Sequence, residues 1–325
     1  MPTIVITGAS AGVGRAVARA FAAPGASLGL LARGGDGLGA VAAEVQAAGA
    51  RAVTVSVDVA DAAAVERAAE TIESKLGPVD VWVNNAMVSV FSPVSELTAD
   101  EVRRVTEVTY LGYVHGTLSA LKRMRARDRG TIVQVGSALA YRAIPLQAAY
   151  CAAKHAVEGF TQALRCELLH DHSGVRVTIV QLPALNTPQF DWVRTRMSGS
   201  PQPVAPIFQP EVAAKAVVWA ATRAPRELKV GWSTLRAIHL DRIMPGLLDR
   251  YLAAKGYEAQ QSATSRRADH RDNLFEPCAG DRGAHGRFDA TSHSTSWQLD
   301  ARMLAGDAWA RITRRSSRHD VTGSR

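Results

Sequence analysis

Short apolar runs alternate with longer segments of helical periodicity along the first 230 residues. The apolar runs are rich in β-branched residues and have few polar interruptions, which is typical of strands buried on both faces. They occupy residues 3–7, 26–31, 52–57, 79–84, 130–136 and 174–181. Helical segments lie between them, at residues 13–23, 38–48, 62–76, 99–127 and 147–170. This alternation predicts an α/β fold with a doubly wound parallel sheet and right-handed crossovers.

The remaining third of the chain departs from this alternation. A helix at residues 211–223 and a strand at 227–230 complete one catalytic domain over residues 1–231. Within it, residues 186–210 are rich in Pro, Gly and Ser and carry Phe190 and Trp192, which predicts a mobile loop over a substrate site.

Two segments follow the catalytic domain. Residues 232–257 have apolar positions with basic flanks and predict a helical extension. It could lie on a membrane surface, or pack on its own domain or on a partner subunit. Residues 258–325 are polar and predict a partly disordered tail, in which Leu274, Phe275 and Trp297 could dock locally.

Composition narrows the possible functions. The net charge of +8 could attract nucleic acid, anionic lipid or a phosphorylated cofactor. We favour the cofactor, because the arginines are scattered and the basic tail lacks the aromatic interleaving of nucleic-acid binders. The three cysteines and the tail histidines have neither zinc-site nor disulfide spacing, so no metal is expected. This pattern fits a reducing, cytoplasmic setting, and we find neither a signal peptide nor an apolar run of transmembrane length.

A glycine-rich turn follows the first predicted strand. The sequence from Thr7 to Gly14 reads TGASAGVG and opens the first helix. Glycine permits a tight turn and close approach of the backbone to a pyrophosphate, and the helix N-terminus presents free N–H groups to it. The turn therefore predicts a dinucleotide site, and its members are Gly8, Ser10, Gly12, Val13 and Gly14.

Candidate acid–base residues occur further along the chain. Tyr150 and Lys154 are four apart in a helical segment and share one face. A lysine ammonium beside a tyrosine stabilises the phenolate and is expected to lower the tyrosine pKa towards neutrality. Ser137 follows the strand at 130–136, at the carboxyl edge where open α/β sheets bind ligands, and its hydroxyl can hydrogen-bond a substrate oxygen.

In combination, the glycine turn, Asn84-Asn85-Ala86, Ser137 and the run from Tyr150 to Lys154 resemble the short-chain dehydrogenase/reductase superfamily. The resemblance covers about residues 3–231. It implies a Rossmann-type fold, a nicotinamide cofactor and oxidoreduction of alcohols or carbonyl compounds. It also implies a homodimer or homotetramer paired through the helices near 99–127 and 147–170.

The second strand bears on the choice of cofactor. It ends at Arg33, and an arginine there can neutralise the 2′-phosphate of NADP, whereas an acidic residue would bind the ribose hydroxyl of NAD. Asp36 lies too far along the loop to take that role. By the resemblance, Asp58 and Val59 border the adenine, and Asn85 and Ala86 line the ribose and nicotinamide side. Pro183 and Thr187 fit the nicotinamide end of the site.

Three positions differ from the usual family pattern. Thr109 stands where many members carry an asparagine that holds a water in the proton relay, and a threonine hydroxyl could also hold a water. Met87 replaces a common glycine and adds bulk near the cofactor. Ala184 follows Pro183 where glycine is frequent.

The residues expected near the substrate are mostly apolar and predict a hydrophobic small-molecule alcohol or ketone. They are Val88, Val90, Leu139, Tyr141, Ile144, Leu146, Phe190 and Trp192. The leading hypothesis is an active NADP(H)-dependent reductase or dehydrogenase. The alternative is a catalytically weak dinucleotide-binding sensor or scaffold, suggested by Thr109 and the long tail.

Overall fold

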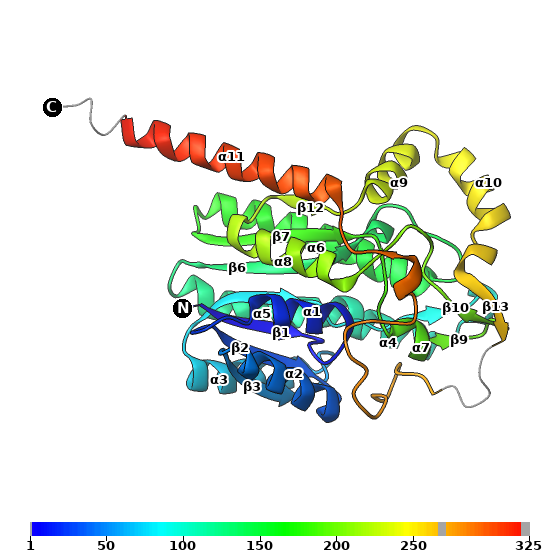
Figure 1. Cartoon of the computed structure of the whole chain (residues 1–325), viewed down its shortest axis with the longest axis horizontal. Helices are drawn as coiled ribbons and strands as arrows, with labels where there is room; N and C mark the ends of the chain where they lie inside the picture. Colours follow the sequence, from blue (N-terminus) through cyan, green and yellow to red (C-terminus); the bar gives the residue numbers. More distant parts are fainter. Residues whose placement is uncertain (1, 266–270, 320–325) are drawn as a thin grey trace.

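A computed structural model describes residues 2–265 and 271–319, with the side chains of 263–265 and 311–319 left out. Its centre is a seven-stranded parallel sheet in the order β12-β7-β6-β4-β1-β2-β3 (Figure 1). The strands are β1 (Thr3–Thr7), β2 (Ser27–Ala32), β3 (Arg51–Ser56), β4 (Val79–Asn84), β6 (Gly130–Ser137), β7 (Val175–Leu182) and β12 (Glu227–Lys229). The predicted α/β fold with a doubly wound parallel sheet is confirmed.

Helices cover both faces of this sheet. One apolar cluster joins the strands to α1 (Gly12–Phe21), α2 (Gly35–Ala47) and α8 (Pro210–Arg223). A second cluster joins the opposite face to helices α3 (Ala62–Leu76), α4 (Ala99–Thr106), α5 (Gly112–Arg125) and α6 (Ala148–His170). Burial on two faces explains why the strands read as nearly uninterrupted apolar runs.

The strand order reverses between β1 and β4. In open α/β sheets, the loops at such a reversal separate and leave a crevice beyond the carboxyl ends of the strands. The β1–α1 turn, the end of β4 and the end of β6 all reach this edge. The fold therefore brings the glycine turn, Asn85 and Ser137 to one edge of the sheet.

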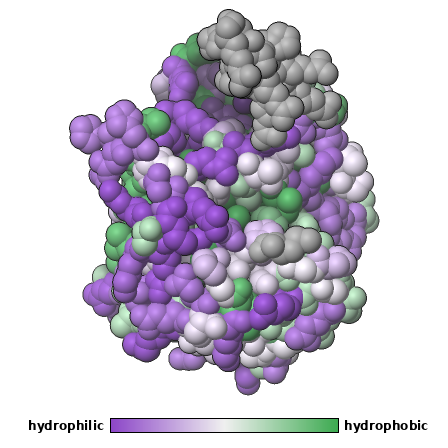
Figure 2. All heavy atoms as spheres, turned by 90° about the vertical axis from the view of Figure 1, so that its left-hand side faces the viewer, coloured by the Kyte–Doolittle hydropathy of each residue, from purple (hydrophilic) through white to green (hydrophobic). Residues whose placement is uncertain are grey.

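The opposite edge of the sheet has a different surface. Seen from the amino ends of the strands, it is mostly hydrophilic, with apolar residues only in small scattered groups (Figure 2). Scattered apolar residues are normal on the surface of a globular protein.

A buried polar network ties β4 to the neighbouring elements. The Asn84 side chain accepts a hydrogen bond from the Trp82 indole at 2.8 Å. It donates to the Tyr113 carbonyl at 3.2 Å, to Thr117 Oγ1 at 3.1 Å and to Gln134 Oε1 at 2.9 Å. Side chains of β4 and β6 are thus fixed to α5 just below the crevice.

Several elements differ from the sequence-based expectation. The segment at 99–127 is two helices, α4 and α5, joined by a π-helical turn over Glu107–Leu111. The short strand β8 (Ala184–Leu185) precedes the loop at 186–210. The loop itself contains α7 (Gln189–Trp192), β9 (Arg194–Thr195), β10 (Gly199–Pro201) and β11 (Ile207–Phe208). β9 pairs with β5 (Val90–Phe91), and β10 pairs with β13 (Gln261–Ser265).

The C-terminal region is also more structured than its polarity indicates. The extension forms two helices, α9 (Trp232–Ile243) and α10 (Pro245–Lys255), which stand apart from the sheet in Figure 1. In the segment expected to be partly disordered, β14 (Ser292–His293) pairs with β11, and α11 (Trp297–His319) follows. Leu274 is fully buried there, whereas Trp297 is exposed and stacks on Trp232. Residues 266–270 and 320–325 of this segment lie outside the described residues.

Candidate active site

The glycine turn is held against the end of β4. Gly8 and Gly12 have positive φ angles of 66° and 55°. A Cβ on Gly14 would lie 2.1 Å from the carbonyl oxygen of Gly8, so the turn admits no larger residue there. The Asn85 side chain donates to the carbonyls of Thr7 at 3.0 Å and Gly8 at 3.3 Å. Glycines have no side chain to keep a ligand away from the backbone, and a bound pyrophosphate requires such a close approach.

Ser137, Tyr150 and Lys154 line one cavity of about 970 Å³ at the carboxyl edge of the sheet. Ser137 ends β6, and its Oγ accepts a hydrogen bond from the Leu139 N–H at 3.1 Å. Tyr150 and Lys154 come from the first turns of α6. The structure thus brings the three predicted acid–base residues together.

Lys154 is a buried ammonium group with two hydrogen-bond acceptors. Its Nζ donates to the Tyr113 hydroxyl at 2.8 Å and to the Val135 carbonyl at 2.7 Å, and Tyr113 itself donates to Val135 at 2.9 Å. Burial lowers the pKa of Lys154 to about 7, because removal from water disfavours the charged form. Tyr113 was missed in the sequence, although it lies four residues after Thr109 on a helix expected at the site.

The pKa of Tyr150 differs from the sequence-based expectation. Burial raises it above its ordinary value, and a hydrogen bond with Ser137 only partly opposes the rise. The lowering expected from Lys154 is not found, because the ammonium donates to Tyr113 and Val135 and lies 5.7 Å from the Tyr150 ring centre. This environment favours the neutral phenol of Tyr150.

Thr109 hydrogen-bonds to Val88 and not to Lys154. It lies in the π-helical turn, and its hydroxyl donates to the Val88 carbonyl at 2.8 Å and accepts from the Val88 N–H at 3.1 Å. The one proton of the Thr109 hydroxyl is therefore already donated to the backbone of the segment that follows β4. The water-holding role considered for Thr109 stays a prediction.

The residues predicted to bind the cofactor line a smaller cavity of about 200 Å³ beside the first. Val13, Asn85 and Thr187 line both cavities, so the two cavities adjoin each other. Predicted residues of the smaller cavity are Gly8, Ser10, Gly12, Val13, Arg33, Asp58, Val59, Asn85, Ala86 and Thr187. Pro183 lines the larger cavity, and Gly14 packs behind the turn.

Two charged groups of the predicted adenosine side contact other residues of the chain. The Arg33 guanidinium donates to backbone carbonyls of the C-terminal region, including that of Phe275 at 2.8 Å. Asp58 forms an ion pair with Arg104. Arg15 does not face the site, because it is buried and paired with Glu44 and Asp281.

The wall of the larger cavity is mostly apolar. Leu139, Ile144 and Phe190 line it, as predicted. Residues of α9 and α10 contribute as well, including Trp232, Leu240, Leu247 and Tyr251, together with Met244 between the two helices. Packing of the extension on its own domain was one of the alternatives that the sequence left open, but the sequence did not indicate that the extension would line this cavity.

Other residues expected near the substrate lie elsewhere. Val88 and Trp192 line the smaller cavity, and Tyr141 instead donates to Glu227 Oε1 at 2.6 Å. Val90 and Leu146 are buried and line neither cavity. These five residues thus do not line the larger cavity, and the apolar substrate site stays a prediction.

Comparison with known proteins agrees with this geometry. Residues 2–197 match the family model described as short chain dehydrogenase. The chain belongs to the short-chain dehydrogenase/reductase family. It is therefore an oxidoreductase enzyme of that family, with a Rossmann-type fold.

Individual relatives of this short-chain dehydrogenase extend the comparison. The oxidoreductase YxnA of Bacillus subtilis is 31% identical over 96% of this chain and 90% of its own length. A short-chain dehydrogenase from Streptomyces avermitilis has a TM-score of 0.66 at 28% identity, covering 78% of this chain and 97% of its own. An alcohol dehydrogenase from Thermococcus sibiricus, solved with 5-hydroxy-NADP, has a TM-score of 0.60 at 29% identity, covering 71% and 96%.

The large apolar cavity and the exposed helical extension raise the question of membrane contact. Among residues 2–265 and 271–319, no helix has the length and apolar character needed to cross a bilayer.

Proposed function

We propose that this short-chain dehydrogenase uses NADP(H) to interconvert an alcohol and a carbonyl group on a hydrophobic small molecule. The main support for this proposal is that Ser137, Tyr150 and Lys154 line one apolar cavity, which adjoins the glycine turn. The turn fits a dinucleotide, because Gly8 and Gly14 leave no room for a Cβ beside the neighbouring backbone. When bound, the nicotinamide supplies or accepts the hydride.

Tyr150 is proposed as the proton donor in the reductive direction. Its raised pKa keeps the phenol protonated at neutral pH, ready to protonate the oxygen of a carbonyl as negative charge develops there. Ser137 would hydrogen-bond the same oxygen and hold it beside the phenol. In the oxidative direction, the Tyr150 phenolate would accept the alcohol proton while Ser137 hydrogen-bonds the same oxygen.

Lys154 is proposed to stabilise the phenolate that Tyr150 becomes after donating its proton. The Lys154 Nζ lies 5.7 Å from the Tyr150 ring centre and is held by Tyr113 and Val135. With a pKa of about 7, a substantial fraction of Lys154 is protonated at neutral pH. This charge does not offset the effect of burial on the pKa of Tyr150, so its proposed role is confined to the phenolate that forms once the proton has been donated.

The preference for NADP(H) is supported by Arg33 at the end of β2. A guanidinium there can pair with the 2′-phosphate, which NAD lacks. A cavity lined by residues such as Leu139, Phe190 and Trp232 supports an apolar substrate body. We therefore expect apolar ketones and aldehydes to be better substrates than small charged hydroxy acids.

Turnover by a Tyr150→Phe variant tests the proposal. NADPH oxidation is measured with a panel of ketones and aldehydes, with NADH in parallel. We expect Tyr150→Phe to lower kcat by about 10²–10⁴-fold, because the proton donor is lost, with NADPH affinity nearly unchanged. The control is Tyr257→Phe, which removes a hydroxyl from an exposed tyrosine that lines neither cavity. Unchanged turnover in Tyr150→Phe would contradict Tyr150 as the proton donor, whereas cofactor binding without turnover in the wild type would favour a sensor or scaffold.

A further inference from the structure

A segment of the C-terminal region crosses the predicted adenosine side of the cofactor site. This segment, residues 271–286, is called the strap. In Figure 1 it is the orange stretch that follows the grey trace, passes α7 and continues towards α11. Its start is fixed by the Asn273 N–H, which donates to the Trp192 carbonyl of α7 at 3.0 Å, and by the Asp272–Arg194 ion pair at 2.9 Å.

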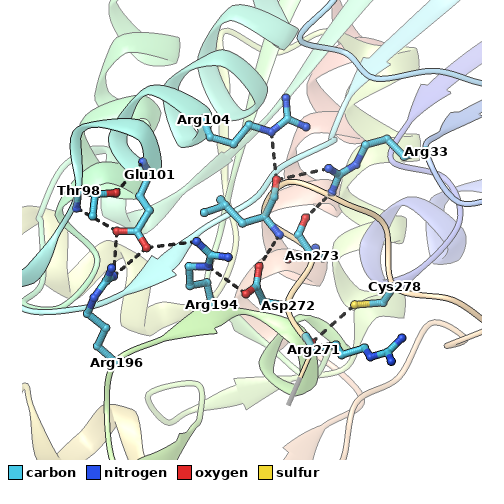
Figure 3. Close-up of polar contacts among 11 residues, drawn as sticks. Arg33, Thr98, Glu101, Arg104, Arg194, Arg196, Arg271, Asp272, Asn273 and Cys278 are labelled. Carbon is cyan, nitrogen blue, oxygen red and sulfur yellow. Dashed lines mark hydrogen bonds and ion pairs between the residues drawn. The ribbon is translucent and has the colours of Figure 1, made fainter. Parts of the chain in front are cut away.

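The strap contacts the guanidinium that is proposed to read the 2′-phosphate. Arg33 donates to three consecutive backbone carbonyls, those of Asn273, Leu274 and Phe275. Figure 3 shows Arg33 and Arg104 converging on this backbone from two sides. These carbonyl oxygens take the Arg33 donors that a 2′-phosphate would use, and their partial negative charge would repel a phosphate brought beside them.

The strap also occupies the apolar side of the site. Leu274 has no exposed surface and belongs to the apolar cluster of Val57, Val59 and Val108. Val59 and its neighbour Asp58 are the residues predicted to border the adenine. Arg104 links the two parts, since its guanidinium contacts both Asp58 and the Leu274 carbonyl. A leucine side chain thus fills apolar surface that a planar base would otherwise cover.

A third contact lies at the glycine turn. The Gly12 N–H, at the first residue of α1, donates to the Gly283 carbonyl at 3.1 Å. An N–H at this position is one of the groups that bind phosphate at a helix N-terminus. Asp281 pairs with Arg15 on α1, and the Gly280 N–H donates to Asp36 at 2.8 Å. These contacts hold the strap against the turn.

The space that remains is small for a dinucleotide. The cavity between the strap and the turn has about 200 Å³, and Pro277, Cys278 and Arg282 of the strap form part of its wall. Pockets for drug-sized ligands span roughly 300–1,000 Å³. The strap therefore narrows the predicted cofactor site. It also accepts hydrogen bonds from two groups there that could bind phosphate, Arg33 and the Gly12 N–H.

We propose that the strap is an autoinhibitory element that occupies the adenosine half of the cofactor site and must move aside before NADP(H) binds. This inference rests on the proposed function. Only molecules with the strap displaced bind the cofactor, so the apparent dissociation constant equals the intrinsic one divided by the displaced fraction. Because both cofactors need the same displacement, the strap weakens NADPH and NADH binding by the same factor.

Cofactor affinity in strap variants tests the proposal. Leu274→Ser removes the buried anchor, and Asp281→Asn weakens the ion pair with Arg15 at the other end. We expect each to lower the Kd for NADPH, with Leu274→Ser lowering it at least about tenfold, and to leave the NADPH to NADH affinity ratio unchanged. Leu304→Ser, the same substitution at an exposed leucine of α11, is the matched control and should bind like the wild type.

Hydrogen exchange on the unaltered chain provides a measurement that does not depend on a variant folding. We expect NADPH to increase amide exchange in peptides covering residues 273–283 while it protects residues 8–14. Protection or no change across 273–283 would overturn the proposal, because the strap would then be a lid or an unrelated contact. So would a higher or unchanged Kd in both variants.

Failure of the proposed function has a different signature. If neither the wild type nor the strap variants bind NADPH or NADH, the proposed function fails and the autoinhibitory role fails with it. If the wild type binds and turns over NADPH but the strap variants bind it no more tightly, only the autoinhibitory role fails.

Discussion

Burial of the Lys154 ammonium costs folding stability, and it also places a positive charge near Tyr150. It is almost completely buried, and its ammonium has two oxygen acceptors and no carboxylate partner within the described residues. A buried cation without a counter-ion is costly, which explains why its pKa falls to about 7. Such a cost is common at sites where the charge acts on a neighbouring group.

Replacement of Lys154 should stabilise the protein in a pH-dependent way. Its folded pKa of about 7 lies below the ordinary 10.5, so between these values the unfolded chain binds more protons. Wild-type stability should therefore rise from pH 7 towards 10.5, with the full cost of burial present below pH 7. We expect Lys154→Met to gain most at pH 6 and least near pH 10, measured by urea unfolding.

Lys255→Met, the same substitution at an exposed lysine, is the control for this measurement. A stabilisation by Lys154→Met that grows with pH would contradict the assigned pKa of Lys154.

Sequence and structure differ at single residues mainly where a hydrogen-bond partner decides the role. The spacing of Tyr150 and Lys154 placed both on one helix face, and the structure agrees. The partner of Lys154 was not predictable, because Tyr113 reaches it across the fold from α5. Thr109 was likewise expected to face the site, but it bonds to the backbone of Val88.

At the scale of elements, the sheet was the most predictable part of the chain. Strands buried on both faces leave an apolar signature that a sequence shows directly. The helix at 99–127 was predicted as one element because neither proline nor a clear cap marks the π-helical turn at Glu107–Leu111. The strap was not predictable, since its contacts with Arg33 and Gly12 use backbone carbonyls that any residue carries.

The polar network of Asn84 is predicted to carry much of the stability of the sheet edge near the site. Asn84→Ala would leave the buried Trp82 indole N–H without its acceptor and remove three donated hydrogen bonds. We expect a loss of about 2–4 kcal/mol in the free energy of unfolding. Chemical denaturation measures this loss, and a change below about 0.5 kcal/mol would show that the network contributes little.

At the scale of the whole molecule, the strand order determines where the crevice lies, whereas the C-terminal region forms part of its walls. Strand reversal between β1 and β4 places the glycine turn beside Ser137 and Tyr150, and this much was foreseeable from the order of elements. The helices α9 and α10 close the substrate side, and the strap covers the adenosine side. YxnA aligns over 96% of this chain, so its similarity extends into this region.

Transfer of deuterium from the cofactor to the substrate tests the central claim most directly. The full chain is incubated with an apolar ketone and NADPH that carries deuterium at both C4 positions of the nicotinamide, and the alcohol is analysed by mass spectrometry. We expect one deuterium on the carbinol carbon with the wild type and almost none with Tyr150→Phe, with NADH less effective than NADPH. Alcohol formed without deuterium, or labelled equally by Tyr150→Phe, would contradict hydride transfer with Tyr150 as the proton donor.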